Sequence, residues 1–465
     1  MLYKPLSYSP TGGRSGEYQI IQTQLGVCVV GGGPAGISLL LAARRAGLLD
    51  ELLGANLRII ERSGLIGPGE IGKYRIRSDS FADSFLRSAE TDVQPPLGHL
   101  LTLTAGRQVA ARRGQPVELS TVGDFLTEIA NEVRRLLEAA DEKPFLTGLV
   151  AIRAERQRDG SWATVCRRAD GRLTEFSSRA IVLATGAHQP MDRLYTQRVA
   201  GAPLLPRFVH KTIQSSDFLS RAGPQKMAAL LAHREFPKVA IVGGSHSALA
   251  SAHVCLNGSG AYTFGPASIT VLHRSQLRLT YASPAVALAD GYTAFGPDDI
   301  CAKTGRISPL AGFRCDSRDL LRRQWGLGGM QPDARLRLLR LEESHYREAN
   351  AILQDADLIV AALGYRPRAL PLFDAAKQPI RLLCERGVGP LVDGRSRVLN
   401  SAGDPVPGVF ALGLSAGYPL AGVHGESNFT GQANGLALWQ SEVGEDLVAQ
   451  VLELNRSALP AAIPA

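Results

Sequence analysis

Two glycine-rich segments of the chain have the residue types and spacing needed to hold phosphate groups. The first, VCVVGGGPAG at residues 27–36, shows the spacing G-x-G-x-x-G between a short apolar run and a longer one. In a strand–turn–helix unit, Gly31 permits a tight turn, Gly33 lets a pyrophosphate approach the backbone, and Gly36 lets helix and strand pack closely. The phosphates then meet the free N–H groups of the helix N-terminus. The residues predicted to bind a nucleotide here are Gly31, Gly33, Pro34, Ala35 and Gly36.

An acidic residue follows the next expected strand, as such a site requires. Residues 57–61, LRIIE, have the pattern of a buried strand that ends in Glu61. A carboxylate at that place binds a ribose hydroxyl of the dinucleotide. The interval between Gly36 and Glu61 is slightly long, and residues 48–56 look like the additional length. Glu61 and its neighbour Arg62 are therefore predicted to complete the first dinucleotide site.

The second glycine-rich segment repeats the unit with small substitutions. In KVAIVGGSHSA at residues 238–248, Ser245 replaces the middle glycine and Ala248 the last one. The strand expected next, residues 269–273, is followed by Arg274 and by no acid, and an arginine there meets a ribose 2′-phosphate. This favours NADPH over NADH, with an incidental surface arginine as the alternative. The residues predicted for this site are Gly243, Ser245, His246, Ser247, Ala248 and Arg274.

With these two loops, three further segments carry a resemblance to a known superfamily. They are IVLATG at residues 181–186, DLIVAALG at 357–364 and VFALG at 409–413. In this combination the sequence resembles the two-dinucleotide-binding-domain flavoproteins. The resemblance implies an α/β fold with two Rossmann-like domains, the NADPH domain inserted in the FAD domain, and a small β-rich element. It divides the chain into residues 1–195 and 367–465 for FAD and 196–366 for NADPH. It also places Thr185, Gly186, Gly413 and Leu414 beside the cofactor.

The branch of this superfamily depends on what stands near the flavin. None of the six cysteines forms a C-x-x-C pair, which argues against the disulfide reductases. Residues 208–218 partly match the fingerprint of the flavin-containing monooxygenases, with His210 and Gln214 replacing its glycine and histidine. Gly413-Leu414 is more similar to the N-hydroxylating monooxygenases of ornithine and lysine. That resemblance implies FAD, NADPH, molecular oxygen and a small-molecule substrate, whose amine nitrogen a C4a-(hydro)peroxyflavin oxygenates.

Two loops supply the predicted catalytic residues. Residues 72–80 follow the Glu61 strand and contain Ser78, and an ordinary surface loop is the alternative. Residues 424–432 precede the expected last helix and contain the amide side chains Asn428 and Gln432. A helix N-terminus there would stabilise charge on a reduced flavin. Two other functions stay open: an FAD oxidase or NADPH oxidoreductase without oxygen insertion, and a non-catalytic flavin-binding redox sensor.

Composition restricts the remaining classes. The 465 residues carry a formal charge of +8, but their arginines are scattered and no run of basic residues suggests nucleic acid. Glycines interrupt the apolar residues 25–43, so no membrane span is expected, and no cysteine spacing matches a metal site. We predict a cytoplasmic enzyme whose homo-oligomerisation is left open. Residues 1–24 are expected to be a loose leader. The helical pattern at 121–137 predicts a helix capped by Thr121, and strands are expected at 149–154, 161–167, 174–176 and 180–183.

Overall fold

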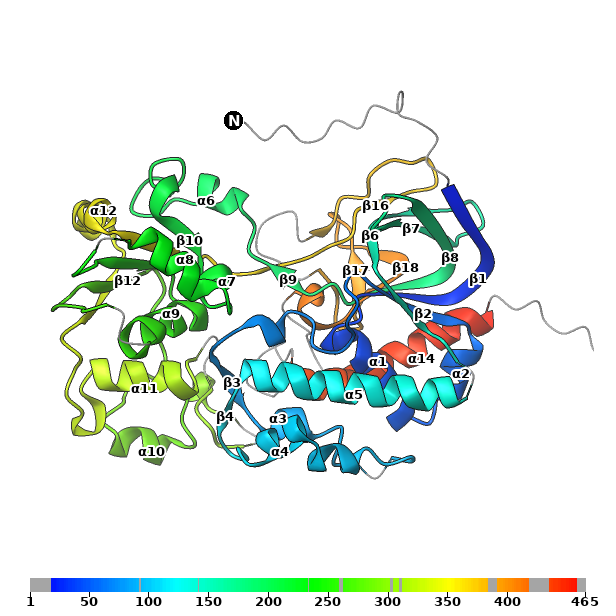
Figure 1. Cartoon of the computed structure of the whole chain (residues 1–465), viewed down its shortest axis with the longest axis horizontal. Helices are drawn as coiled ribbons and strands as arrows, with labels where there is room; N and C mark the ends of the chain where they lie inside the picture. The colour runs from blue at the N-terminus through cyan, green and yellow to red at the C-terminus, as the bar shows by residue number, and fades with distance from the viewer. Residues whose placement is uncertain are drawn as a thin grey trace, which may run out of the picture.

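The protein folds into two α/β units that two chain crossings connect (Figure 1). This computed structural model describes residues 18–91, 93–140, 142–232, 234–258, 262–301, 304–308, 312–383, 391–417 and 435–457. Each unit has its own sheet with a parallel strand–glycine loop–helix unit at its centre. The predicted α/β class with two dinucleotide-binding folds is confirmed.

The first unit is built on a nine-stranded sheet of the described residues. Its order is β16-β6-β7-β8-β1-β2-β5, and β18 pairs with both β8 and β17. β1 lies parallel between β2 and β8, whereas β6, β7 and β8 are antiparallel and form the expected β-rich element. The strands are β1 Tyr18–Val30, β2 Leu57–Glu61, β5 Phe145–Thr147, β6 Leu149–Arg156, β7 Trp162–Arg168, β8 Leu173–Leu183, β16 Leu372–Phe373, β17 Arg397–Leu399 and β18 Pro405–Ala411.

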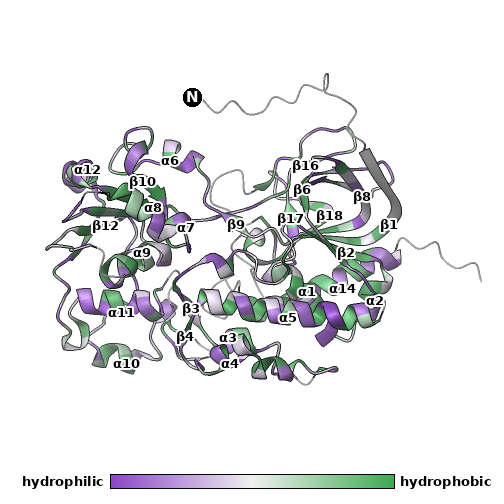
Figure 2. Ribbon diagram, viewed as in Figure 1, coloured by the Kyte–Doolittle hydropathy of each residue, from purple (hydrophilic) through white to green (hydrophobic). Residues whose placement is uncertain are grey.

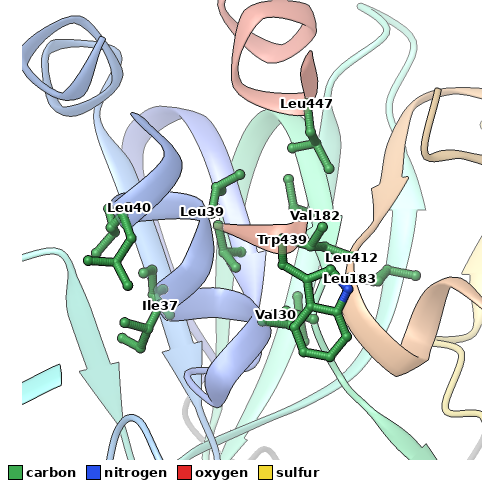
Figure 3. Close-up of a cluster of buried hydrophobic side chains, with 14 of the residues drawn as sticks. Val30, Ile37, Leu39, Leu40, Val182, Leu183, Leu412, Trp439 and Leu447 are labelled. Carbon is green, nitrogen blue, oxygen red and sulfur yellow. The ribbon is translucent and has the colours of Figure 1, made fainter. Parts of the chain in front are cut away.

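Helix α1 (Pro34–Arg45) is the centre of this unit's core. Leu39 and Leu40 are fully buried on it; Leu39 lies on the side of Val182 of β8 and Leu447 of α14, and Leu40 lies with Ile37 on the other side (Figure 3). α14 (Glu442–Ser457) packs along α1, and the two helices bury their apolar faces against the sheet. The other helices here are α2 Leu49–Gly54, α3 Asp83–Leu86, α4 Thr104–Ala110, α5 Leu119–Ala139 and α13 Leu436–Trp439. The glycine loop therefore stands on a rigid base.

Several expected boundaries are wrong at their ends. β1 begins at Tyr18 and pairs with β8 from Leu173 onward, so residues 18–24 are part of the sheet and not a loose leader. The two short strands expected at 174–176 and 180–183 are one strand, β8. The predicted helix at 121–137 is α5, but it starts at Leu119 and Thr121 is not its cap. The backbone N–H of Leu119 instead donates to Ile76 O in a loop far away in sequence.

The second unit contains a five-stranded parallel sheet of order β10-β14-β11-β12-β13. Its strands are β10 Thr212–Gln214, β11 Val239–Val242, β12 Ile269–His273, β13 Leu336–Arg340 and β14 Leu358–Ala361. Its helices are α7 Ser215–Phe218, α8 Gly223–Leu230, α9 His246–Asn257, α10 Pro284–Ala289, α11 Cys315–Gln324 and α12 Tyr346–Asp355. Green apolar and purple polar residues alternate around the helices of both units, as expected where one face meets a core (Figure 2).

The two crossings between the units run side by side (Figure 1). β9 (Ala187–His188) leaves the first unit and pairs antiparallel with β15 (Arg366–Pro367), which returns to it. Helix α6 (Asp192–Thr196) follows β9 directly. The domain boundaries predicted near residues 195 and 366 stay a prediction. No helix among the described residues is long and apolar enough to cross a membrane.

Candidate active-site cleft and cofactor-binding loops

The first glycine loop has the shape that its sequence predicts. Gly31 has a φ of +117°, and a Cβ there would stand 2.3 Å from Ala184 O, just after β8. Only glycine therefore fits the turn that leads from β1 into α1. A Cβ on Gly36 would stand 2.0 Å from Gly31 O, which is the close packing of helix on strand. Both residues are therefore fixed by the protein's own backbone.

Gly33 lies in a different environment. It is the N-cap of α1, with a φ of −76° and no side chain that accepts from the first helical turn. A Cβ there would contact only Gly69, at 3.3 Å from its Cα and 3.8 Å from its N. Pro34 takes the first helical position, where its missing N–H costs nothing. A helix N-terminus without a side-chain cap, entered by a glycine that packs closely on another glycine, fits a dinucleotide pyrophosphate.

Glu61 stands beside this loop at the end of β2. Its Oε2 accepts from the Gly32 N–H at 2.8 Å, and its Oε1 accepts from the Ser63 N–H at 2.8 Å. The carboxylate is thus held next to the glycines, where a ribose hydroxyl can reach it. Arg62 forms an ion pair with Glu70, which also pairs with Lys73. The residues around the first loop fit FAD.

Two other segments expected near the cofactor come to the same place. The Thr185 hydroxyl donates to Arg368 O, and the N–H of Arg368 donates to Gly186 O at 2.9 Å. A Cβ on Gly413 would stand 2.6 Å from the Ala35 Cβ, so the end of β18 packs directly on the first turn of α1. Leu414 follows with its side chain 42% exposed. The end of β18 and the first loop therefore form one surface.

The second loop repeats this geometry. Gly243 has a φ of +142°, and a Cβ there would stand 2.3 Å from the carbonyl oxygen of Ala362, which directly follows β14. Ser245 is the N-cap of α9, and its side chain makes no capping hydrogen bond. His246 and Ser247 are the first residues of the helix, and Ala248 is buried beneath them. Arg274 is exposed directly after β12. An uncapped helix start and a nearby guanidinium fit a phosphorylated dinucleotide.

A cleft of about 400 Å³ lies between the two units. Leu414 lines it from the first unit, and His246 and Ser247 line it from the start of α9. One cavity therefore reaches both the start of α9 and the residue that follows Gly413, which packs on the first turn of α1. Its ionic and imidazole side chains are Arg75, Arg77, Asp79, Glu118, His246, His253, Arg314 and Asp316, and its phenols are Tyr74 and Tyr365.

Polar contacts join the two sides of this cleft. Arg77 on β3 (Arg77–Phe81) donates from Nε to Asp316 Oδ2 of α11 at 2.8 Å, and a second bond makes the pair bidentate. β3 itself pairs with β4 (Pro116–Glu118). The hydroxyls of Tyr74 and Tyr365 lie 3.0 Å apart, one from each side of the cleft. Burial, and next the neighbouring Tyr74, raise the pKa of the Tyr365 phenol, so Tyr365 is a neutral hydrogen-bonding group.

His246 is held between the two units. Its Nε2 accepts from the Arg314 N–H at 3.3 Å, which assigns the proton to Nδ1. The ring packs 4.9 Å from that of Phe313, and Asp79 Oδ2 lies 3.8 Å from Nε2. Burial lowers the pKa of His246 below its ordinary value of 6.5, although Asp79 opposes this. The imidazole is therefore neutral at neutral pH and acts by shape and hydrogen bonding.

The predicted catalytic residues have different outcomes. Ser78 lines the cleft, but its hydroxyl donates to Ser80 O at 2.5 Å and accepts from the Val117 N–H at 3.1 Å. The second of these bonds holds β3 to β4, so Ser78 has a structural task. Its catalytic role stays a prediction. Asn428 and Gln432 lie outside the described residues. Among the described residues, no group of three or more His, Cys, Asp and Glu side chains could hold a metal ion.

Sequence reasoning missed half of the cleft. The expected loop at 72–80 does line it, but Tyr365 and residues 314–317 come from the second unit and carry no recognisable motif. The backbone of Cys315 has a φ of +46°, a value that few residues other than glycine adopt, and nothing in the sequence indicates it. Only the folding of the chain brings residues 77 and 316 together.

The two nucleotide-binding folds and the cleft between them define a two-domain flavoprotein. Its fold is that of ornithine hydroxylase (PvdA) from Pseudomonas aeruginosa, with a TM-score of 0.55, 14% identity and coverage of 93% of this chain and 100% of that one. The ornithine N-hydroxylase KtzI of Kutzneria sp. 744, solved with FADred, NADP+ and L-ornithine, has a TM-score of 0.55, 15% identity and coverage of 94% and 100%. DfoA of Erwinia amylovora, a cadaverine monooxygenase bound to FAD, has a TM-score of 0.54 at 12% identity, with coverage of 92% and 95%.

A curated protein is more similar in sequence. CMP-5′-(3-aminopropyl)phosphonate hydroxylase from Streptomyces rubellomurinus is 30% identical over 445 residues, which cover 94% of this chain and 99% of that protein. The chain therefore belongs to the family of this hydroxylase, and the predicted N-hydroxylating monooxygenase branch is confirmed. The predicted cofactors, FAD and NADPH, agree with the ligands of the related structures. No protein-family model matches the chain.

Proposed function

We propose that this protein is an FAD-dependent, NADPH-using monooxygenase that hydroxylates the amine nitrogen of a small molecule. The cleft carries the proposal, because Leu414 from the FAD side and His246 from the NADPH side line one cavity. A substrate in that cavity lies within reach of both cofactors. Membership in a hydroxylase family supports the same reaction.

The cofactor loops have separate tasks in this proposal. Gly33, Pro34 and the first turn of α1 hold the FAD pyrophosphate, and Glu61 holds its ribose. Gly243 and residues 245–248 hold the pyrophosphate of NADPH, and Arg274 binds its 2′-phosphate. Bound FAD supplies the redox chemistry, taking electrons from NADPH and activating oxygen. The division of the chain at residues 195 and 366 and a cytoplasmic location belong to the same proposal.

The chain's own groups prepare the substrate. An amine must lose its proton before the nitrogen lone pair can attack, and a carboxylate oxygen of Asp79 or Glu118 on the cleft wall can hold that proton. The neutral His246 beside Asp79 adds no positive charge that would repel an ammonium group. The hydrogen-bonded hydroxyls of Tyr74 and Tyr365 line the cleft. Exclusion of water protects the reaction from side products.

The lining also suggests what kind of amine enters. Arg75, Arg77 and Arg314 alternate with three carboxylates, those of Asp79, Glu118 and Asp316. Such a surface suits a molecule that bears both an ammonium and an anionic group. The substrate in the name of the Streptomyces relative has both, an aminopropyl group and a phosphonate linked to CMP. We therefore propose a primary amine that carries phosphonate or phosphate groups as the substrate.

Turnover with a panel of amines tests the function. The FAD-loaded protein is mixed with NADPH, oxygen and either 3-aminopropylphosphonate, its CMP ester, ornithine or lysine, and mass spectrometry measures hydroxylamine formation. We expect hydroxylamine from a phosphonate-bearing amine and little hydrogen peroxide. If NADPH oxidation yields only peroxide with every amine, the protein is an oxidase and the proposal is wrong. A flavin that NADPH does not reduce would instead leave the redox-sensor function.

A further inference from the structure

The two crossings between the units gather positive charge at one place. β9 and β15 pair so that His188 lies opposite Arg366. Five residues after His188, α6 carries Arg193, and this helix stands above the second unit at the end of β9 (Figure 1). Arg193 and Arg366 thus come from the outgoing and the returning crossing, respectively.

Arg193 reaches over the sheet of the second unit. Its Nη1 lies 3.5 Å from the position that a Cβ would take on Gly364, three residues beyond the end of β14. β14 neighbours β11, which precedes the second glycine loop. The guanidinium therefore lies at the carboxyl edge of the parallel strands, where ligands of such sheets bind.

One end of the Arg193 guanidinium has no acceptor. Nη2 donates to Gln197, but Nη1 is buried and finds no hydrogen-bond partner within the described part of the chain. A buried donor without a partner is costly, and a charged one more so. The side chain is held in place by its surroundings while its outer nitrogen lacks an acceptor.

Two further guanidinium groups stand near Arg193. Burial lowers its pKa first, and then repulsion from Arg366 and from Arg274, with Asp192 acting in the opposite direction. Arg366 donates to Tyr365 O at 3.1 Å. Within the described ranges, none of these three arginines has a carboxylate at ion-pair distance, whereas arginines elsewhere, such as Arg77, Arg322 and Arg397, form ion pairs. Three neighbouring cations without an ion-pair partner are the arrangement that a phosphate-rich ligand would neutralise.

We propose that Arg193 and Arg366, together with Arg274, bind the phosphate groups of NADPH beside the two crossings that join the units. This inference rests on the proposed use of NADPH and adds two specificity residues that no glycine-loop motif contains. Because Arg366 lies on the returning crossing and Arg193 directly follows the outgoing one, the same contacts connect cofactor binding to the segments that join the two units. The anion is either the 2′-phosphate or the pyrophosphate.

Titration calorimetry on the FAD-loaded protein tests this proposal. We expect Arg193→Met and Arg366→Met each to raise the Kd of NADP+ about tenfold or more, since a charge-assisted hydrogen bond is lost. Arg198→Met is the matched control, because it removes an exposed charge from the same segment and leaves the Kd unchanged. Weaker binding of NADP+ alone assigns the 2′-phosphate, whereas equal weakening of NADP+ and NAD+ assigns the pyrophosphate.

A thermal measurement separates lost binding from lost folding. Arg193→Met removes a half-buried charge whose Nη1 has no acceptor, so without NADP+ its Tm should equal or exceed that of the wild type. The rise in Tm that NADP+ causes in the wild type should become smaller in the variant. Unchanged Kd values in both variants would overturn the inference while leaving the function intact. A wild-type protein that binds no NADP+ would instead overturn the proposed NADPH use itself.

Discussion

Three glycines of the first loop are one motif in the sequence but have three different neighbours in the structure. Added methyl groups on Gly31 and Gly36 would collide with backbone oxygen atoms, at 2.3 and 2.0 Å. On Gly33 the methyl group would meet only the backbone of Gly69, with its Cα at 3.3 Å, a tight contact that a shift of a few tenths of an ångström relieves. The protein's own packing thus requires Gly31 and Gly36 strictly, whereas at Gly33 it demands much less and a bound pyrophosphate supplies the stronger reason for glycine.

This difference predicts separable effects of substitution. Gly33→Ala should fold with a Tm close to that of the wild type but bind FAD at least about tenfold more weakly, because hydrogen bonds to the pyrophosphate are lost. Gly36→Ala should lower the Tm instead. The ratio of flavin absorbance to protein absorbance and the Tm of each purified variant measure the two effects.

Gly47→Ala is the control for glycine removal itself. Gly47 has a φ of +70° and no atom within 4 Å of a Cβ, so alanine there costs about 1–2 kcal/mol of backbone strain and no contact. Normal FAD content is expected. Full FAD content in Gly33→Ala would contradict the assignment of this loop to FAD.

At the scale of elements, the sequence predicted those units whose signals are local. Short apolar runs located β1, β2, β11 and β12. The glycines after β1 and β11 located the helices that follow the two loops. β1 extends to Tyr18 because it pairs with β8, and that partner lies more than a hundred residues away. The last helix was expected to run from about residue 431 to 439, so α14 after it was missed. The reason is related, since the buried face of α14 is defined by α1. Ends and partners of elements depend on contacts that no local pattern contains.

The cleft shows this limit most clearly. Arg77 lies in a loop that the sequence did single out, but Asp316 lies 239 residues further along the chain. The pair connects β3 of one unit to α11 of the other. Its side chains are 41% and 21% exposed, so the pair adds at most about 1 kcal/mol to stability. We expect the ion pair to matter chiefly because it fixes the Arg77 side chain on the cleft wall.

Arg77→Met should therefore affect substrate binding more than folding. For an amine that carries a phosphonate, we expect the KM to rise about tenfold or more while kcat changes little, because a charged contact made in the bound state is lost. An amine without an anionic group should show no such rise. Steady-state kinetics of hydroxylamine formation measure both values.

Arg167→Met is the matched control, as it removes an exposed arginine from β7, away from the cleft. It should leave both constants unchanged. An equal effect of Arg77→Met on charged and uncharged amines would show that Arg77 supports the cleft's shape and does not recognise an anion.

In the molecule as a whole, imidazole groups are withdrawn from solvent in the second unit and on the crossing strand β9. Burial is the largest cause that lowers the pKa of His188, His246 and His273 below the ordinary value of 6.5. Each is neutral when folded at neutral pH and binds a proton more readily when unfolded. Stability is therefore fully present above about pH 6.5 and falls as the pH decreases below that value, least for the half-exposed His188, where solvent screens the effect.

His273→Asn isolates one of these contributions. The His273 Nδ1 donates to Ser275 O at 2.9 Å, and an asparagine amide can make the same bond without titrating. Between pH 7.5 and about pH 5.5 the Tm of the FAD-loaded wild type should fall, and the fall should be smaller in this variant. His210→Asn, at an exposed position, should retain the full wild-type decrease. Parallel curves for wild type and His273→Asn would mean that His273 is protonated in the folded protein, which its burial beside β13 opposes. The loss of stability would then come from carboxylates, whose protonation lies at lower pH.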